Sequence, residues 1–290
     1  MNYTDHSVLV NNINLHYIEY PNNGPAMLLM HGLTANAHAF GGLIAAGLAD
    51  DFHIYSVDLR GRGQSDHPAF HYSMNDHARD IIGLLDALGL NQVILCGHSF
   101  GGLLSIYLAA NYPKYASKLI ILDAAARMNP RAAELLGYRL STLDSVYPSW
   151  EEYLAEVKAA PYNTFWEDAM EEYYRADIRP AQKGGITPSA NLSNIIEASV
   201  GLAQISWPSE IEKVQQPALL INAPEDYNLD EPLLPDDYAR ETAEALPHGK
   251  YLRVDGNHQT MLYGKGARQT VKAIRNFCLP AVVAPAPADQ

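Results

Sequence analysis

Short runs of apolar residues alternate along the chain with segments whose apolar positions recur at helical spacing. Continuous apolar runs of this length are typical of parallel strands that are buried on both faces. They cover residues 26–30, 54–57, 93–96, 119–122 and 218–221. Helices are predicted over residues 76–88, 103–110 and 271–277. The alternation of strands and helices predicts a doubly wound α/β sheet.

One long segment interrupts this alternation. Residues 127–206 hold amphipathic helical pieces separated by prolines and no strong strand signal, and the alternation resumes only after them. We therefore predict a core formed by residues 1–126 and 207–278, with residues 127–206 inserted as a helical lid. Residues 279–290, in which Pro and Ala alternate with Val, are predicted to be a flexible tail.

Composition narrows the class of protein. The chain has 290 residues, 48% of them hydrophobic, which excludes a disordered or fibrous chain. Its 33 acidic and 20 basic residues give a net charge of −13, which argues against nucleic acid or an anionic membrane as partner. Two cysteines are too few for a disulfide framework. No signal-peptide pattern or apolar run of about 18 residues is found, so the expected location is cytoplasmic.

The strongest local signal is the sequence Gly97-His98-Ser99-Phe100-Gly101. It follows a predicted strand directly and precedes a predicted helix. A Gly-x-Ser-x-Gly at such a junction holds the serine in a sharp, strained turn, and the helix N-terminus beside it favours a developing negative charge. Ser99 is therefore the candidate nucleophile.

In these features the chain resembles the α/β-hydrolase superfamily, and three further motifs support the resemblance. His31-Gly32-Leu33 follows a predicted strand, and Asp58-Leu59-Arg60-Gly61-Arg62-Gly63-Gln64-Ser65 matches the family's Asp-x-x-Gly-x-Gly-x-Ser loop. Leu219-Leu220-Ile221-Asn222-Ala223-Pro224-Glu225-Asp226 matches the strand and turn of the catalytic acid, with Ala223 where the family usually has Gly. The resemblance implies a mostly parallel eight-stranded sheet flanked by helices, with an inserted lid.

The family order of nucleophile, acid and histidine places the catalytic base near the end of the chain. Of the two histidines there, His258 follows a strand-like segment, whereas His248 lies in a Pro-His-Gly turn where we expect it to be solvated. We therefore assign the role of base to His258. It would accept the proton of Ser99, because a free serine hydroxyl is a poor nucleophile.

The catalytic acid would fix the tautomer of the histidine. Asp226 is the match implied by the resemblance. Glu225 would replace it if the turn slips by one residue, and Asp123, at the end of an earlier strand, occupies the place that some members of the superfamily use. The resemblance also implies an oxyanion hole formed by the backbone N–H groups of Leu33 and Phe100.

No cofactor or metal is expected. Gly61-x-Gly63 lacks the Gly-Lys-Ser/Thr ending of a phosphate-binding loop, and no cluster of Cys and His residues has metal-ligand spacing.

Aromatic residues of the predicted lid are expected mainly to pack it onto the core. Part of the set, for which we select Trp150, Tyr153, Phe165 and Trp166, is expected to line an apolar pocket above Ser99.

The negative charge is concentrated in two segments. Residues 150–177 contain eight acidic and two basic residues, and residues 225–244 contain eight acidic and one basic residue. In the resembled fold both segments lie on the side of the active site. A negative mouth would favour neutral or cationic substrates over anionic ones.

The sequence thus predicts a serine hydrolase that cleaves a neutral carboxylic ester or lactone through an acyl-enzyme. Its expected partner is a small-molecule substrate, with neither nucleic acid nor membrane, and the protein is expected to be a monomer or homodimer. The alternatives are a C–C bond hydrolase or amidase using the same triad, or a ligand receptor with slow turnover on the same scaffold, because a fold does not fix the reaction.

Overall fold

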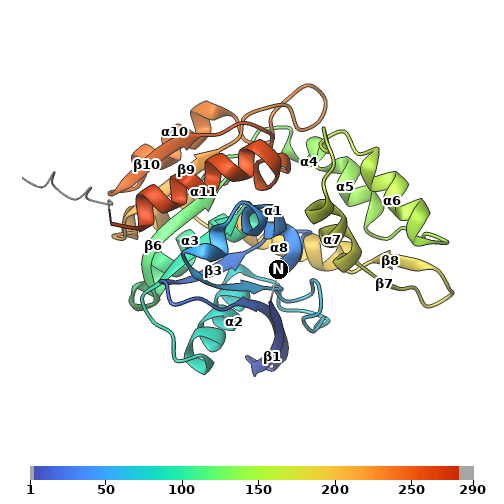
Figure 1. The fold of residues 1–290 in the computed structure, drawn as a ribbon, viewed down its shortest axis with the longest axis horizontal. Helices are drawn as coiled ribbons and strands as arrows, with labels where there is room; N and C mark the ends of the chain where they lie inside the picture. The colour runs from blue at the N-terminus through green and yellow to red at the C-terminus, as the bar shows by residue number, and fades with distance from the viewer. Residues whose placement is uncertain (1–2, 281–290) are drawn as a thin grey trace, which may run out of the picture.

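The computed structural model describes residues 3–280 and contains one eight-stranded sheet in the order β1-β2-β4-β3-β5-β6-β9-β10 (Figure 1). The strands are β1 (Thr4–Val10), β2 (Ile13–Tyr20), β3 (Ala26–Met30), β4 (His53–Val57), β5 (Val93–His98), β6 (Ala116–Leu122), β9 (Ala218–Asn222) and β10 (Gly249–Arg253). Every apolar run used in the prediction falls within one of these strands. The tail predicted for residues 279–290 lies outside the described residues from residue 281 onward.

The sheet is mostly parallel, as predicted. β2 pairs antiparallel with β1 and with β4, and all the other neighbours in the sheet pair in parallel. Parallel strands carry helices on both faces and are therefore buried on both faces. This explains why β3, β9 and the last four residues of β6 are almost entirely apolar.

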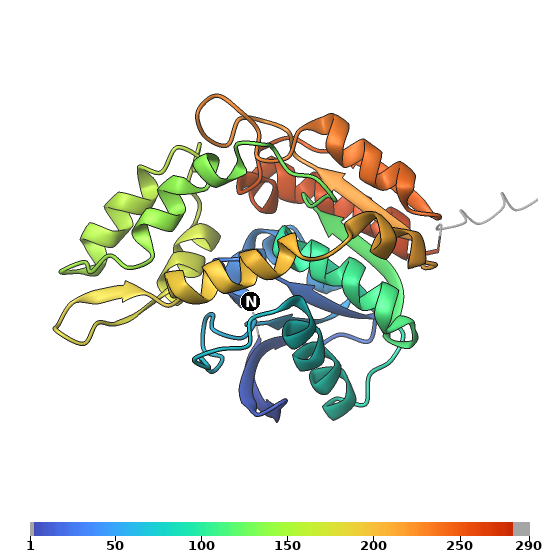
Figure 2. The same cartoon turned by 180° about the vertical axis from the view of Figure 1, so that it is seen from behind.

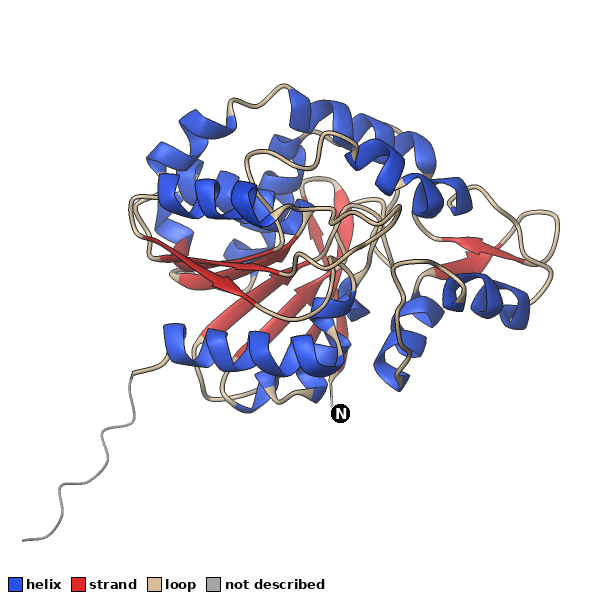
Figure 3. Cartoon of the chain, turned by 90° about the horizontal axis from the view of Figure 1, so that it is seen from above, coloured by secondary structure: helices blue, strands red, loops and turns tan. Residues whose placement is uncertain are grey.

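Helices cover both faces of the sheet, as seen from above in Figure 3. The helices of the core are α1 (Gly41–Ala45), α2 (Met74–Ala87), α3 (Phe100–Asn111), α9 (Trp207–Lys213), α10 (Asp236–Ala245) and α11 (Gly264–Cys278). One apolar cluster joins the sheet to α2, α3, α9 and α10, and a second joins it to α1 and α11. At the start of α2, Ser73 and Asp76 form a capping box, which fixes where the helix begins.

A segment between β6 and α9 stays outside the main sheet. It contains α4 (Ala132–Leu135), α5 (Gly137–Thr142), α6 (Trp150–Lys158), α7 (Asp168–Ala176), β7 (Ile178–Pro180), β8 (Ile186–Pro188) and α8 (Leu192–Ala203). We call residues 127–206 the insertion. Figure 2 shows the insertion to one side of the sheet, with α8 running from it back to the core.

The insertion, predicted to be helical, also contains two short strands. β7 and β8 pair antiparallel as a separate two-stranded sheet. Each strand has only three residues, and the last residue of each is proline. Neither strand therefore shows the longer apolar run on which strand prediction depends. Within residues 3–280, we find no helix with the length and apolar character needed to span a bilayer.

Candidate active site

Ser99 lies between the last residue of β5 and the first residue of α3, as the motif predicted. Its backbone has φ +54° and ψ −116°, a conformation that a non-glycine residue rarely adopts. The surrounding glycines make this turn possible, because a Cβ on Gly97 would overlap the carbonyl oxygen of Gly101, and a Cβ on Gly101 would overlap that of Met30. The strand, turn and helix therefore hold Ser99 in a strained position at the wall of a cavity, as serine nucleophiles require.

His258 is held by Asp123. The Nδ1 of His258 lies 2.7 Å from Oδ2 of Asp123, and both side chains are buried. The other carboxylate oxygen of Asp123 accepts hydrogen bonds from the backbone N–H of Ala223 at 2.9 Å and from the side-chain amide of Asn222 at 2.8 Å. These donors fix the Asp123 carboxylate. Because this carboxylate binds Nδ1 of His258, Nε2 of the ring remains available to accept a proton.

The expectation that Asp226 would hold His258 was wrong. Asp226 is exposed in the turn after β9, and its backbone carbonyl accepts a hydrogen bond from the amide of Asn257. Glu225 is exposed in the same turn. The physical reason is the left-handed backbone of Asp123, with φ +50°, which turns its carboxylate from the end of β6 toward His258.

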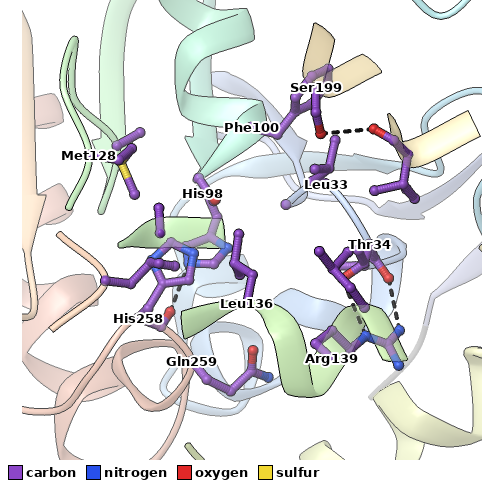
Figure 4. Close-up of a pocket in the computed structure, with 18 of the residues that line it drawn as sticks. Leu33, Thr34, His98, Phe100, Met128, Leu136, Arg139, Ser199, His258 and Gln259 are labelled. Carbon is purple, nitrogen blue, oxygen red and sulfur yellow. Dashed lines mark hydrogen bonds between the residues drawn. The ribbon is translucent and has the colours of Figure 1, made fainter. Parts of the chain in front are cut away.

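His98 lies next to His258 and binds its backbone (Figure 4). Its Nε2–H donates to the backbone carbonyl of His258 at 2.8 Å, and the two imidazole ring centres are 4.5 Å apart. Complete burial, aided by the nearby His258, lowers the pKa of His98 well below its ordinary value, so the ring stays neutral. This hydrogen bond ties the turn that carries Ser99 to the backbone of His258.

The two expected oxyanion donors lie at the same cavity. Leu33 and Phe100 both line it, and among the described residues neither backbone N–H makes a hydrogen bond. The Gly32 carbonyl and the Leu33 N–H belong to the same peptide group. That carbonyl accepts hydrogen bonds from His31 Nδ1 at 2.7 Å and from the N–H of Ala35 at 3.1 Å, and these bonds fix the orientation of the peptide group. That the two free N–H groups bind an oxyanion remains a prediction.

His31 is fixed in one protonation state. Its Nε2 accepts from the backbone N–H of Leu59 at 3.0 Å, so the proton of the neutral ring is on Nδ1. Burial lowers the pKa of His31 to about 4. A further donor, Nε of Arg62, reaches the carbonyl of Leu33 at 2.9 Å. The loop after β3 is therefore held by the side chains of His31 and Arg62.

Ser99, His98 and His258 open onto one cavity of about 550 Å³. Its walls are mostly apolar and come from the core and from the insertion. The insertion contributes residues of α4, α5 and α8 to these walls. Four buried tyrosines also border the cavity: Tyr162, Tyr173, Tyr174 and Tyr227.

None of the four aromatic residues selected from the sequence lines this cavity. Trp150 and Tyr153 pack within the core of the insertion, where their rings lie 6.0 Å apart. Trp166 stacks on Tyr174, and Phe165 lies at the surface beside Gly264. That expectation was wrong because the spacing of apolar residues identifies the buried face of a helix without telling whether the face meets protein or cavity.

The remaining motif, the loop from Asp58 to Ser65, has a structural role. The carboxylate of Asp58 accepts from His16 Nδ1 at 2.7 Å and from the N–H of Ala37 at 2.7 Å. Ser65 donates to the carbonyl of Asp58 at 2.6 Å. Among residues 3–280, no group of three or more His, Cys, Asp or Glu side chains could hold a metal ion.

Comparison with known proteins gives consistent matches. A family model described as "alpha/beta hydrolase fold" matches residues 25–264. A 2-(acetamidomethylene)succinate hydrolase from Mesorhizobium japonicum is 31% identical over 202 residues, covering 69% of this chain and 70% of that protein. The crystal structure of an E-2-(acetamidomethylene)succinate hydrolase superposes with a TM-score of 0.83 at 27% identity, covering 95% of this chain and 99% of the other.

More distant structures share the fold. The enol-lactonase from Burkholderia xenovorans LB400 has a TM-score of 0.69 at 23% identity, covering 94% of this chain and 99% of that chain. The thioesterase domain from the curacin biosynthetic pathway has a TM-score of 0.73 at 18% identity, covering 95% and 99% of the two chains. At these identities the likeness concerns the fold alone.

Proposed function

Because this chain belongs to the α/β-hydrolase family and is a hydrolase, we infer that it is a serine hydrolase that cleaves a carboxylic ester or lactone through an acyl-enzyme. One observation carries the proposal. A strained serine at a strand–helix turn opens onto the same cavity as a buried histidine whose Nδ1 is bound to a buried carboxylate. This is the arrangement that activates a serine hydroxyl.

The first half of the reaction forms the acyl-enzyme. Nε2 of His258 accepts the hydroxyl proton of Ser99 as Oγ attacks the substrate carbonyl carbon, and the carbonyl oxygen becomes an oxyanion. The free N–H groups of Leu33 and Phe100 donate to that oxyanion, each contributing roughly 3 kcal/mol of transition-state stabilisation. The bond to the leaving oxygen then breaks, and the imidazolium of His258 gives its proton to the leaving alcohol.

The second half releases the product acid. Nε2 of His258 takes a proton from water, whose oxygen attacks the acyl carbon. The tetrahedral intermediate then collapses, and the proton returns to Ser99 as its bond to the acyl group breaks. Throughout, Asp123 remains ionised, keeps the proton of neutral His258 on Nδ1 and stabilises the imidazolium that forms twice in each cycle.

A second candidate is hydrolysis of an amide. Its support is the full-length likeness to an enzyme named as a hydrolase of an acetamido compound, at 27% identity and a TM-score of 0.83. The same residues would serve, with His258 protonating a departing nitrogen instead of an oxygen. An ester and an amide with the same acyl group, compared by kcat/KM, separate the two candidates.

The acidic side chains that led to the expectation of a neutral substrate do not line the cavity. Residues 150–177 and 225–244 contribute Tyr162, Tyr173, Tyr174, Tyr227 and Leu233 to its wall. None of the described residues that line it is Asp or Glu. The expectation of a neutral substrate therefore loses the observation on which it rested.

A fluorophosphonate probe tests the proposed nucleophile. Wild-type protein should be labelled on Ser99, and Ser99→Ala should not be labelled. Labelling that survives this substitution would place the nucleophile elsewhere. A panel of 4-nitrophenyl esters and lactones then tests the activity, because negligible turnover together with ligand-induced thermal stabilisation would favour the receptor alternative.

A further inference from the structure

The cavity beside Ser99 has one strongly charged side chain. Arg139, on α5, is the single Lys or Arg among the described residues that line it, and no acidic residue accompanies it there. Its side chain is 6% exposed, so the guanidinium is nearly removed from bulk water. A charge in such an environment interacts far more strongly with a ligand than a charge at the surface does.

The protein uses three of the five N–H donors of Arg139. Nη2 donates to Asp177 at 2.8 Å. Nη2 also donates to the carbonyl of Thr34 at 3.0 Å, and Nε donates to the hydroxyl of Thr34 at 3.3 Å (Figure 4). Nη1 is buried and has no hydrogen-bond partner among the described residues. Guanidinium groups that are fully occupied by a structural role leave no such pair of donors.

The surroundings keep Arg139 charged and add neutral donors. Burial works against the charge, but Asp177 and the nearby buried tyrosines together outweigh it, and the pKa of Arg139 lies well above its ordinary value. Burial raises the pKa of Tyr173 and of Tyr227 well above the ordinary value, and the positive charge of Arg139 opposes this rise in both. Both phenols line the cavity and stay protonated, so their O–H groups are available as donors near a cation.

An unpaired N–H group on an arginine that lines the same cavity as a nucleophile suggests where a substrate anion binds. Carboxylates are the common partners of arginine, because their two oxygens match the N–H groups of the guanidinium. The other walls of the cavity are apolar and suit a short hydrocarbon connection. Arg139 also contacts Thr34, which directly follows the proposed oxyanion donor Leu33, so its site is close to the reacting carbonyl.

We propose that the cavity binds substrates that carry a free carboxylate, which the guanidinium of Arg139 receives while the scissile carbonyl lies at Ser99. The proposal rests on the proposed function, which it deepens by naming the substrate class. It assigns to the pair of Arg139 and Asp177 a role in specificity, in addition to the link that Arg139 makes between the insertion and the loop after β3.

Two pairs of substrates test the proposal, each pair differing only by a carboxylate and its uncharged amide. The first compares phenyl hydrogen adipate with phenyl 5-carbamoylpentanoate, in which the change is on the acyl part. The second compares 4-acetoxybenzoate with 4-acetoxybenzamide, in which it is on the leaving group. Wild type should prefer the carboxylate at least tenfold in kcat/KM in one pair, and that pair identifies the part that faces Arg139.

Substitution of Arg139 should remove this preference. Arg139→Gln should lower kcat/KM at least tenfold more for the preferred carboxylate than for its amide. Arg127→Gln makes the same charge change at an exposed arginine at the start of the insertion, and should leave the ratio unchanged. Equal losses for both substrates in Arg139→Gln, or no preference in wild type, would assign Arg139 a purely structural role and overturn the proposal.

Binding provides a measurement that depends neither on turnover nor on a folded arginine variant. Thermal stabilisation of Ser99→Ala by succinate, glutarate and adipate is compared with that by the corresponding diamides. At least one diacid should stabilise the protein more than its diamide does, and equal effects of all pairs would contradict the proposal. If wild type hydrolyses nothing but still binds diacids selectively, the proposed function fails and the carboxylate site stands.

Discussion

His258 and Asp123 are 135 residues apart in the sequence, and a hydrogen bond of 2.7 Å joins Nδ1 of the imidazole to Oδ2 of the carboxylate. Asp123 follows the last residue of β6, whereas the expected acid, Asp226, follows β9, the neighbouring strand in the sheet. Two carboxylates thus stand at adjacent strand ends, and one of them is bound to the histidine.

Replacing Asp123 by Asn should nearly abolish turnover while the fold is retained. Asn tolerates the left-handed backbone at this position, but its amide can no longer hold the required tautomer of His258. We expect kcat to fall about 10³- to 10⁴-fold, with a much smaller change in KM. Steady-state kinetics with a 4-nitrophenyl ester and circular dichroism provide the measurements.

Asp226→Asn is the matched control. The side chain is exposed and does not contact His258, so kcat should stay within about twofold of wild type. A loss in Asp226→Asn comparable to that in Asp123→Asn would show that the acid changes place during turnover.

The turn that carries Ser99 should tolerate no side chain at Gly101. A Cβ there would overlap the carbonyl oxygen of Met30 and press on that of His31, and both are backbone atoms that cannot rotate away. Gly101→Ala should therefore destabilise the protein by on the order of 3 kcal/mol or more, measured by urea unfolding.

Gly137→Ala makes the same change where a Cβ would meet nothing within 4 Å. Gly137 begins α5, and alanine reduces the conformational freedom of the unfolded chain, so we expect stabilisation of about 0.5–1 kcal/mol. Equal stability of the two variants would contradict the assigned packing of α3 against the loop after β3.

The burial of His31 should make stability depend on pH. Its pKa is about 4 in the folded protein, against an ordinary value of 6.5, so below pH 6.5 the unfolded chain binds a proton that the folded chain does not. The contribution of neutral His31 is complete above pH 6.5 and is lost as the pH falls toward 4. The two pKa values correspond to a loss of roughly 3 kcal/mol.

His31→Asn removes this titration, so the difference in unfolding free energy between wild type and variant should shrink as the pH falls from 7 to 4. Urea unfolding at several pH values measures it. The other buried histidines are common to both proteins and cancel in the difference. The exposed His248, changed to Asn, provides a control whose curve should run parallel to that of wild type. A parallel curve for His31→Asn would mean that His31 is not held neutral.

The strands and the position of Ser99 can be predicted from the sequence, because each depends on residues that are close together in the chain. The strands are recognisable since a strand buried on both faces has no polar positions, and Ser99 is recognisable since the elbow needs glycines next to it. The identity of the catalytic acid depends instead on residues that are far apart in the chain. β6 and β9 are neighbours and end at the same edge of the sheet, and only the φ of Asp123 and the donors Asn222 and Ala223 decide between the two carboxylates.

The cavity wall escapes sequence reasoning for a related reason. The aromatic face of α6 shows clear helical spacing, but that face packs against protein within the insertion. The residues that do line the cavity include Leu136, between two short helices, and Tyr227, in a turn, where no periodicity exists. Which side of a residue meets empty space depends on how the insertion sits over the core, and the pattern of one helix does not contain that information.

The cavity assignment itself is tested by reducing its volume. Leu136 lines the cavity near His258 and Arg139 (Figure 4), and Leu136→Trp should fill part of the space. For a bulky ester we expect KM to rise about tenfold, which corresponds to about 1.4 kcal/mol of lost binding. For an acetate ester, which needs little room, the change should be small, because Ser99 and His258 are untouched.

Phe165→Leu alters an aromatic residue of the insertion that lies outside the cavity, and should leave both KM values unchanged. If Phe165→Leu impaired the bulky ester while Leu136→Trp did not, the substrate would bind against Phe165 instead, one of the aromatic residues selected from the sequence.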